Sequence, residues 1–585
     1  MNPARGKSTL VFGIDFGTTY SGVSWLFCRE NSPIKEPEVV THWLSALSSN
    51  SDRTKVPSKI YYKKETGQTQ WGYNIPTDLQ PIQWFKLLLL EKNDLPADIR
   101  NSSHIQRARD MMTAEGKTAV GLVGNYLKVL WEHIISEIND EKGPSLVNGT
   151  AFHVVLTIPA IWKDYARDRM RQAAEQAGIL DDRLAGKTTL DFITEPEAAA
   201  IATLPDLDAR DDLVVGDSFV VLDAGGGTVD IISYKVEKLA PLVVSECVEG
   251  DGALCGATFV DSAFETFIEQ RVGRKSWKLM KDTDIKKWMN NEWEHGIKKD
   301  FDGSQAKYCI DLPKRNKRGQ MSICNEEIRG IFEPVLSQIH DLFLKQLIAV
   351  KCRTGKNPKF VILVGGFGRC PFLFKRLTQQ FNGITDILQA RGEKPWSAIC
   401  RGAVLSGAMG RGLTEQVVKV QSRVARMSYG WKFWTEFNPN CHDLRDKVWD
   451  RVRGKWMASN QIEWAIKRGQ DMSNLKPVTY KYRRYFDIGE KGVRKLKDEL
   501  FTSESLHPSS RHDNTVNYHS TIKYPTSCPV QDMPLKPRRG SLGSYHVWDF
   551  KYKMQVSGAA LTISIIPGNK KGSEIASTSL TVKTE

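Results

Sequence analysis

The sequence lacks the features that mark several classes of protein. Its ten cysteines form no Cys-x-x-Cys pair, and some, such as Cys309 and Cys400, lie in apolar segments. We therefore expect reduced, packed thiols rather than disulfides or zinc ligands. The longest apolar runs, such as residues 360–364, are too short to span a bilayer. The first predicted strand begins within about ten residues of the start, which leaves no room for a secretory leader. These absences predict a cytoplasmic or nuclear protein without a membrane partner.

A dense block of like charges is also missing. Residues 415–585 contribute about +12 of the net charge of +14, with 29 Lys and Arg interleaved among 17 Asp and Glu. Between residues 431 and 468, tryptophans lie among basic residues, a pattern compatible with nucleic-acid binding or with a helix that buries its Trp face. No RNA-binding signature string is present, so we favour the helix, and we interpret residues 494–499 as a second, solvated helix. A nucleic-acid partner is not expected, and we favour a protein-interaction surface.

Two glycine-rich loops, each led by an aspartate, are the most informative features present. The first runs from Gly13 to Ser21 as GIDFGTTYS, and the second runs from Asp223 to Asp230 as DAGGGTVD. Each follows an apolar strand, and glycines in such turns let successive N–H groups form a nest for phosphate oxygens. The aspartates would repel phosphate, so each implies a magnesium ion between carboxylate and phosphate. The pair predicts a duplicated fold that binds a nucleotide from two sides.

The remaining pattern predicts alternating strands and helices. Strands are expected at 152–159 and 360–364, and helices at 115–138, 164–178 and 326–350. Such alternation favours an α/β fold with a largely parallel sheet. Beyond about residue 413 the chain becomes basic and β-prone. We therefore predict a domain at 1–413, with lobes of approximately 1–215 and 216–413, and a smaller, mainly β domain with helical pieces at 414–585.

Five motifs in order resemble those of the heat shock protein 70 family. They are the two phosphate loops, a connecting motif Thr157-Ile158-Pro159-Ala160, the helix start Glu195-Pro196-x-Ala198, and the adenosine motif Gly365-Gly366-x-x-Arg369-x-Pro371. The resemblance covers residues 10–410. It implies a two-lobed actin-like ATPase fold built from duplicated ribonuclease H-like lobes, with ATP or ADP and Mg²⁺ in the cleft.

The resemblance also implies site residues. Asp15 and Asp223 would hold hydrated magnesium, Glu195 would orient its water shell, and Lys86 and Asp230 would position the attacking water. The alternative for Lys86 is an ordinary surface lysine. The phosphates would contact Gly17, Thr18, Thr19, Tyr20, Gly225, Gly226, Gly227 and Thr228. The nucleoside would contact Glu294, Lys298, Lys299, Gly365, Gly366 and Arg369, with Arg369 stacked on the adenine.

Several positions depart from the family pattern. Phe367 and Trp396 replace a serine and an aspartate near the adenosine motif, and Cys255-Gly256-Ala257-Thr258 replaces a Gly-Gly-acid-acid pattern. Glu294 lies one residue further from the basic pair than in the family. The family's acidic, leucine-rich linker and acidic tail are not recognisable in residues 410–425 and 580–585. These departures bear on nucleotide affinity and turnover, and on whether a chaperone cycle extends to the C-terminal half.

The sequence therefore predicts an ATP-binding and ATP-hydrolysing protein resembling heat shock protein 70, with client proteins and co-chaperones as partners. One alternative is a nucleotide-gated binding module with little turnover. A second is a sugar or polyol kinase on the same fold, for which Asp251 and Asp261 are the candidate catalytic residues.

Overall fold

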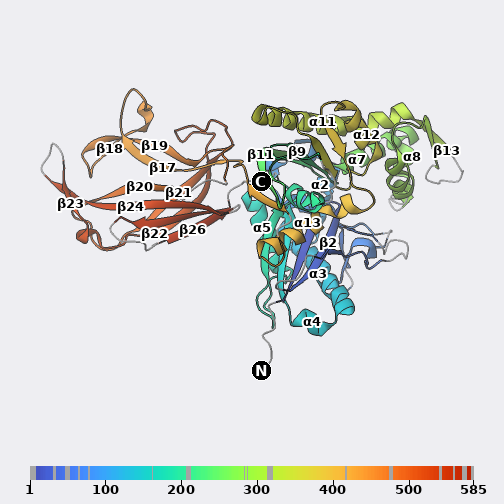
Figure 1. The fold of residues 1–585 in the computed structure, drawn as a ribbon, viewed down its shortest axis with the longest axis horizontal. Helices are drawn as coiled ribbons and strands as arrows, with labels where there is room; N and C mark the ends of the chain where they lie inside the picture. The colour runs from blue at the N-terminus through green and yellow to red at the C-terminus, as the bar shows by residue number, and fades with distance from the viewer. Residues whose placement is uncertain are drawn as a thin grey trace. The chain divides into compact units, whose positions relative to one another are not determined.

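The computed structural model divides the chain into two compact units, residues 1–419 and 420–585 (Figure 1). It describes residues 8–29, 35–45, 53–63, 66–76, 79–95, 97–160, 162–205, 212–281, 284–285, 288–311, 320–415, 418–472, 478–538, 543–557, 560–568 and 576–581. The division lies six residues beyond the predicted boundary at 413. Each unit has its own apolar core.

The first lobe of unit 1 is built on a sheet with the order β3-β2-β1-β7-β8, in which β4 also pairs with β2. Antiparallel β1 and β2 form a hairpin around the first phosphate loop, and β7 and β8 follow in parallel. The strands are β1 (Ser8–Phe16), β2 (Tyr20–Arg29), β3 (Glu38–Val39), β4 (Val56–Pro57), β7 (Ala151–Ile158) and β8 (Thr189–Thr194), beside a small hairpin of β5 (Ile60–Tyr62) and β6 (Thr69–Trp71).

The second lobe repeats this topology. Its sheet has the order β15-β14-β9-β10-β11-β16, so the hairpin around the second phosphate loop is again flanked by two parallel strands. The strands are β9 (Ser218–Ala224), β10 (Val229–Lys238), β11 (Leu242–Ala253), β14 (Phe360–Val364), β15 (Asp386–Leu388) and β16 (Val418–Ser422), and β12 (Lys307–Asp311) pairs separately with β13 (Gln320–Cys324). The duplication seen in the loops is therefore a duplication of the whole sheet.

The helices lie where the apolar periodicity predicts them. The predicted helices at 115–138, 164–178 and 326–350 correspond to α3 (Ala119–Lys142), α5 (Asp164–Gln176) and α11 (Asn325–Thr354). The other helices of unit 1 are α1 (Ala97–Arg100), α2 (Ser103–Ala114), α4 (Pro144–Asn148), α6 (Glu195–Thr203), α7 (Ala257–Val272), α8 (Arg274–Lys278), α10 (Lys298–Asp300), α12 (Pro371–Gln380) and α13 (Lys394–Gly410), with 3-10 turns η2 (Gly72–Asn74), η3 (Phe85–Leu89) and η4 (Lys92–Asp94) and a π-helix, η6 (Met289–Ile297).

Helices α6 and α13 pack tightly against each other. At their closest approach a Cβ on Gly402 would overlap the backbone carbonyl of Ala198, so a residue without a side chain is required there. On β1, a Cβ on Gly13 would overlap the backbone of α13 in the same way. These contacts fix α13 against the strand that carries Asp15 and against the helix that begins with Glu195.

Unit 2 is a β-sandwich. One sheet has the order β18-β19-β17-β21-β22, and the other has β20-β24-β25-β26 with β23 paired to β24. Aromatic side chains of both sheets, including Trp431 and Phe550, share one core. The strands are β17 (Ser428–Glu436), β18 (Lys447–Asp450), β19 (Lys455–Ile466), β20 (Val478–Asp487), β21 (Lys495–Ser503), β22 (Asn517–Pro525), β23 (Leu535–Pro537), β24 (Ser544–Ser557), β25 (Ala560–Pro567) and β26 (Ala576–Thr581), with 3-10 turns η7 (Leu444–Asp446) and η8 (Val530–Asp532).

Three expectations from the sequence are corrected. The Trp-rich basic segment forms strands β17, β18 and β19 rather than a helix, and Trp434, Trp449 and Trp456 are about half exposed. The predicted helix at 494–499 is the start of strand β21. All ten cysteines are thiols, but three of them, among them Cys309, are exposed rather than packed.

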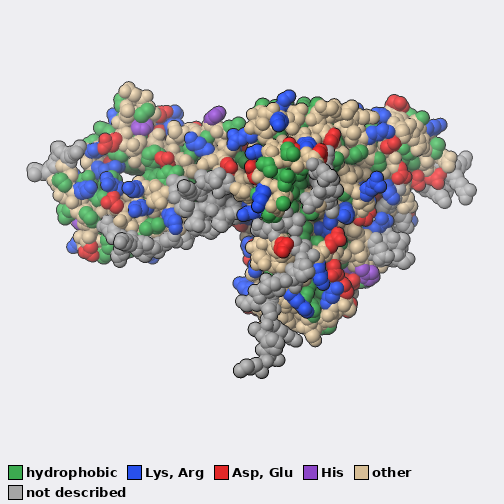
Figure 2. All heavy atoms as spheres, viewed as in Figure 1, with side chains coloured by type: hydrophobic (Ala, Val, Ile, Leu, Met, Phe, Trp, Pro, Cys, Tyr) green, Lys and Arg blue, Asp and Glu red, His purple; other side chains and the backbone are tan. Residues whose placement is uncertain are grey.

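In Figure 2, the Lys and Arg side chains on the visible face of unit 2 are scattered among acidic and apolar ones. No described helix is both long and apolar enough to cross a bilayer.

Candidate functional site

The two phosphate loops of unit 1 lie against each other. A Cβ placed on Gly226 would overlap the side chain of Thr19, and one on Gly227 would approach Thr18 Oγ1 to 2.8 Å. The loops therefore bring four of the predicted phosphate contacts to one place. Only glycine lets the threonine side chains of the first loop pack so closely on the backbone of the second, and the hydroxyl groups gathered there suit an anion.

Four carboxylates are buried behind these loops. Asp15 is the penultimate residue of β1 and Asp223 that of β9, while Asp230 follows the second loop on β10 and Glu195 begins α6. None of the four is more than 5% exposed. Burial and the charge of Glu195 raise the pKa of Asp230 to about 7, and burial with the same neighbour raises the pKa of Asp223 well above its usual value. Four ionised carboxylates buried together repel one another, so the cluster needs a nearby cation to be stable.

Lys86 supplies part of that positive charge. Its Nζ lies 2.6 Å from Glu195 Oε1, and its side chain is 2% exposed. The short helix η3, which begins directly after Trp84, places it there. The backbone of Trp84 is left-handed at φ 62°. Nζ also lies 5.4 Å from the ring centre of Trp162. The interpretation of Lys86 as a surface lysine is therefore wrong.

A second buried lysine, Lys55, was not predicted as a site residue from the sequence. Its ammonium donates to Asp15 Oδ2, and the residue is 5% exposed. The nearby Ser58 hydroxyl donates to the carbonyl of Gly17 at 2.7 Å, which ties the same segment to the first loop. The segment before β4 has no regular sequence pattern. Only the pairing of β4 with β2 shows that Lys55 belongs to the site.

The altered motif at residues 255–258 supports the second loop from behind. The N–H groups of Gly256, Ala257 and Thr258 donate to the carbonyls of Gly227, Gly225 and Gly226 at 3.0–3.2 Å. The Thr258 hydroxyl adds a bond of 2.8 Å to Gly226. These bonds satisfy the carbonyls of Gly225, Gly226 and Gly227 within the protein. The departure from the family pattern therefore preserves the loop.

The adenosine motif is rearranged around Trp396. Arg369 forms two hydrogen bonds with Glu393, at 2.7 and 3.1 Å, and its guanidinium lies 5.4 Å from the ring centre of Trp396. Tyr20 meets the same indole edge-on. Phe367 is buried in the core of the second lobe. The Phe367 departure is therefore a core residue, whereas the Trp396 departure lies beside Gly366.

The predicted ribose helix contains a π-helical turn. Glu294 and Lys298 lie within and just after η6, and Lys298 Nζ lies 2.7 Å from Glu294 and 2.8 Å from Asp261. Burial alone would lower the pKa of Lys298, but the two carboxylates raise it above its usual value. Gly296, between Glu294 and Lys298, has non-helical backbone angles, so this turn is kinked between the two side chains. Lys299 is exposed on α10.

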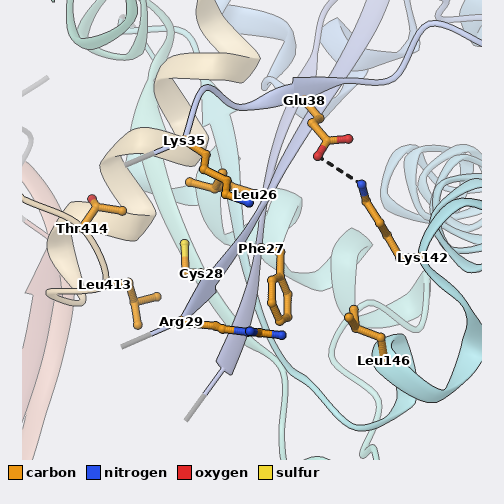
Figure 3. A pocket seen from close by; sticks show the side chains of 10 residues that line it. All are labelled: Leu26, Phe27, Cys28, Arg29, Lys35, Glu38, Lys142, Leu146, Leu413 and Thr414. Atoms are coloured by element: carbon orange, nitrogen blue, oxygen red, sulfur yellow. Dashed lines mark ion pairs between the residues drawn. The ribbon is translucent and has the colours of Figure 1, made fainter. Parts of the chain in front are cut away.

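The two kinase candidates are already engaged in ion pairs. Asp261 is paired with Lys298, and Asp251 Oδ2 lies 2.5 Å from Lys345 Nζ. Neither arrangement resembles a general base directed at a substrate hydroxyl. A pocket of about 350 Å³ at the end of β2 contains none of the predicted site residues (Figure 3). The pocket has mixed apolar and charged walls, with Lys142 paired to Glu38 at 3.4 Å.

The carboxylate cluster fits a hydrated divalent cation. Asp223 Oδ1 and Asp230 Oδ2 are buried without a hydrogen-bond partner. With all four carboxylates and both ammonium groups charged, the cluster carries two excess negative charges, which one divalent cation balances. Among the described residues, no three Asp, Glu, His or Cys side chains converge as metal ligands. Mg²⁺ keeps several of its waters and takes few protein ligands beside substrate phosphates, so the free oxygens of Asp223 and Asp230 would suit such an ion.

Two lobes of the same topology, each with an Asp-led phosphate loop that lies against the other, define an actin-like ATPase fold. Residues 133–438 match the family model described as Hsp70 protein. The chain belongs to the Hsp70 family, whose members bind nucleotide. It is 25% identical over 516 residues to heat shock 70 kDa protein 12A of Mus musculus, which covers 72% of this chain and 71% of that protein.

Two further relatives extend the comparison. Heat shock 70 kDa protein 12B of Homo sapiens is 24% identical over 525 residues, 75% of this chain and 73% of that protein. The mitochondrial-type heat shock protein 70 of Encephalitozoon cuniculi is 30% identical over 283 residues, 47% of this chain and 43% of that protein. The matches to the first two relatives are too long to fit within the predicted ATPase domain at 1–413.

Proposed function

We propose that this protein binds Mg-ATP between the two lobes of unit 1 and hydrolyses it slowly, as part of a chaperone-like cycle in the cytoplasm or nucleus. The observation that carries the proposal is the carboxylate cluster with its unpartnered oxygens, behind two opposed phosphate loops. Asp15 and Asp223 would hold the hydrated ion, and Thr18, Thr19 and Thr228 with N–H groups of the loops would bind phosphate. Magnesium neutralises phosphate charge and polarises the bond to be broken.

The remaining site residues act on water and on the nucleoside. Glu195 would orient the ion's water shell, and Lys86, 2.6 Å away, favours its ionised form. Asp230 accepts a hydrogen bond from the Ala160 N–H at 3.1 Å through one oxygen and keeps the other for the attacking water. Glu294, Lys298 and Arg369 lie around the nucleoside. Residues 414–585 form the second domain, whose β-sandwich contacts client proteins or co-chaperones.

Replacing Asp223 by Asn tests this function. The variant should bind ATP in the presence of Mg²⁺ about tenfold or more weakly, because an amide cannot neutralise the ion's charge. Calorimetric titration with ATP and Mg²⁺ measures the affinity, and phosphate release measures turnover. Asp341→Asn is the matched control, since Asp341 on α11 is a surface residue whose side chain is 77% exposed. Equal affinity and turnover in the wild type and in Asp223→Asn would refute the site. Normal affinity with no phosphate release in the wild type would favour a nucleotide-gated binding module.

A further inference from the structure

Lys55, Gly22 and Asp15 lie in one row across three strands. Asp15 on β1 is directly opposite Gly22 on β2, and β4 pairs with β2 so that Val56 faces Ser21. Continued by one residue, that register puts Lys55 opposite Gly22 on its other side. Residues that are directly opposite share one face of a sheet. A lysine and an aspartate separated by a glycine can therefore meet over the strand between them.

Gly22 leaves room for this contact. A Cβ on Gly22 would lie 3.0 Å from Lys55 Cγ and 3.2 Å from its Cε, closer than side chains normally pack. The lysine stem thus crosses the space that any other residue would fill. Tyr73 fixes the starting point, because its hydroxyl donates to the Lys55 carbonyl at 3.2 Å. The strand register, the glycine and the tyrosine all serve to deliver one ammonium group to Asp15.

A lysine at this place changes how Asp15 can bind a metal ion. The ammonium occupies Asp15 Oδ2, one of the oxygens on which a hydrated ion would depend. Positive charge at this distance in a buried site repels a divalent cation and attracts phosphate. The lysine is therefore a resident cation of the phosphate site.

We propose that the Lys55 ammonium is a built-in counter-ion that competes with Mg²⁺ for Asp15 and supplies positive charge to the nucleotide phosphates. This inference rests on the proposed nucleotide site and names a residue that sets its dependence on metal. It implies two opposite consequences of removing the charge. Metal-free nucleotide loses an attractive partner, whereas a divalent cation without nucleotide gains an unoccupied carboxylate oxygen.

The experiment compares the full-length wild type with Lys55→Met, which keeps the length of the stem without its charge. ADP is titrated in the presence of EDTA, and Mn²⁺ is titrated without nucleotide by electron paramagnetic resonance. We expect Lys55→Met to bind ADP about tenfold more weakly and Mn²⁺ about tenfold more tightly, the size of one charge-assisted contact. Gly22→Ala, which keeps both charges but displaces the stem, should move both affinities in the same directions by less. Lys128→Met, an exposed lysine on α3, should change neither.

Opposite shifts of the two affinities support the proposal, because a general loss of structure weakens both. Unchanged affinities in Lys55→Met, or a loss of both, would overturn it. If Lys55→Met does not fold, Gly22→Ala decides by the same criterion. If the wild type binds ADP with Mg²⁺ but Lys55→Met changes neither affinity, this inference is wrong and the proposed function stands. If the wild type does not bind ADP with Mg²⁺, both this inference and the proposed function are wrong.

Discussion

Replacing Lys86 by Met would leave the carboxyl group of Glu195 buried without its ammonium partner. The two side chains are 2% and 7% exposed and are joined at 2.6 Å. Burial already raises the pKa of Glu195, and Lys86 is the main influence that lowers it. Methionine fills most of the same volume, so the change removes a charge and little packing. The Lys86→Met variant therefore measures how an isolated charge is tolerated at this place.

The size of the effect follows from the alternative open to Glu195. Breaking a buried ion pair costs about 3–5 kcal/mol, but the carboxyl group can instead take up a proton. At 1.36 kcal/mol per pH unit, protonating a group of usual pKa 4.5 costs about 3.4 kcal/mol at pH 7.0 and about 1.4 kcal/mol at pH 5.5. The folded-state pKa of Glu195 in the variant lies above its unfolded value, so stability is regained as the pH falls toward 4.5.

Urea unfolding of the full chain at pH 7.0 and 5.5, followed by circular dichroism, measures this dependence. We expect Lys86→Met to lower the free energy of unfolding by about 3 kcal/mol at the higher pH and by less than half of that at the lower. The double variant Lys86→Met/Glu195→Gln removes the charge as well and should recover most of the loss. A loss that is equal at both pH values, or a double variant as unstable as the single one, would refute this account of the pair.

Two further predictions concern stability. Desolvation and then Arg411 lower the pKa of buried His153 to about 4, so the folded state resists a proton that the unfolded state accepts below pH 6.5. Unfolding free energy should therefore fall by up to about 3 kcal/mol between pH 6.5 and 4, and His153→Gln should flatten that part of the curve; an unchanged curve would count against a buried neutral imidazole. Gly402→Ala should cost about 1–3 kcal/mol in urea unfolding, because its Cβ would overlap the carbonyl of Ala198. Gly410→Ala, on the same helix with nothing near its Cβ, is the control and should be neutral or stabilising; equal effects at both positions would contradict the tight helix contact.

The sequence carried the parts of the site that local pattern can encode. The two phosphate loops follow apolar strands that local pattern locates, whereas Glu195 and Lys86 were predicted from the resemblance to the heat shock protein 70 motifs. Lys55 could not be found in this way, because its partner is set by the pairing of β4 with β2 across an irregular segment.

The C-terminal domain misled the helix prediction for a similar reason. In β19, Asn460 adopts a left-handed φ of 58°, and the register of β17 against β19 shifts between Phe433 and Thr435. Such an irregularity breaks the alternation of apolar and polar residues by which a strand is recognised. Tryptophans at Trp449 and Trp456 that looked like one face of a helix are instead cross-strand neighbours, with ring centres 5.1 Å apart.

The short turn that carries Lys86 also touches the opposite lobe. Trp84, two residues earlier, stacks on His104 at 4.7 Å and meets Phe259 of α7 edge-on at 5.7 Å, while His104 lies 2.8 Å from the hydroxyl of Ser262. Prising the lobes apart would pull on this turn at one end while Glu195 holds the other. The segment thus connects the second lobe to Glu195. If the lobes separated, the Trp84 indole would leave its aromatic surroundings for water, and its fluorescence would report the movement that also displaces the Lys86 ammonium.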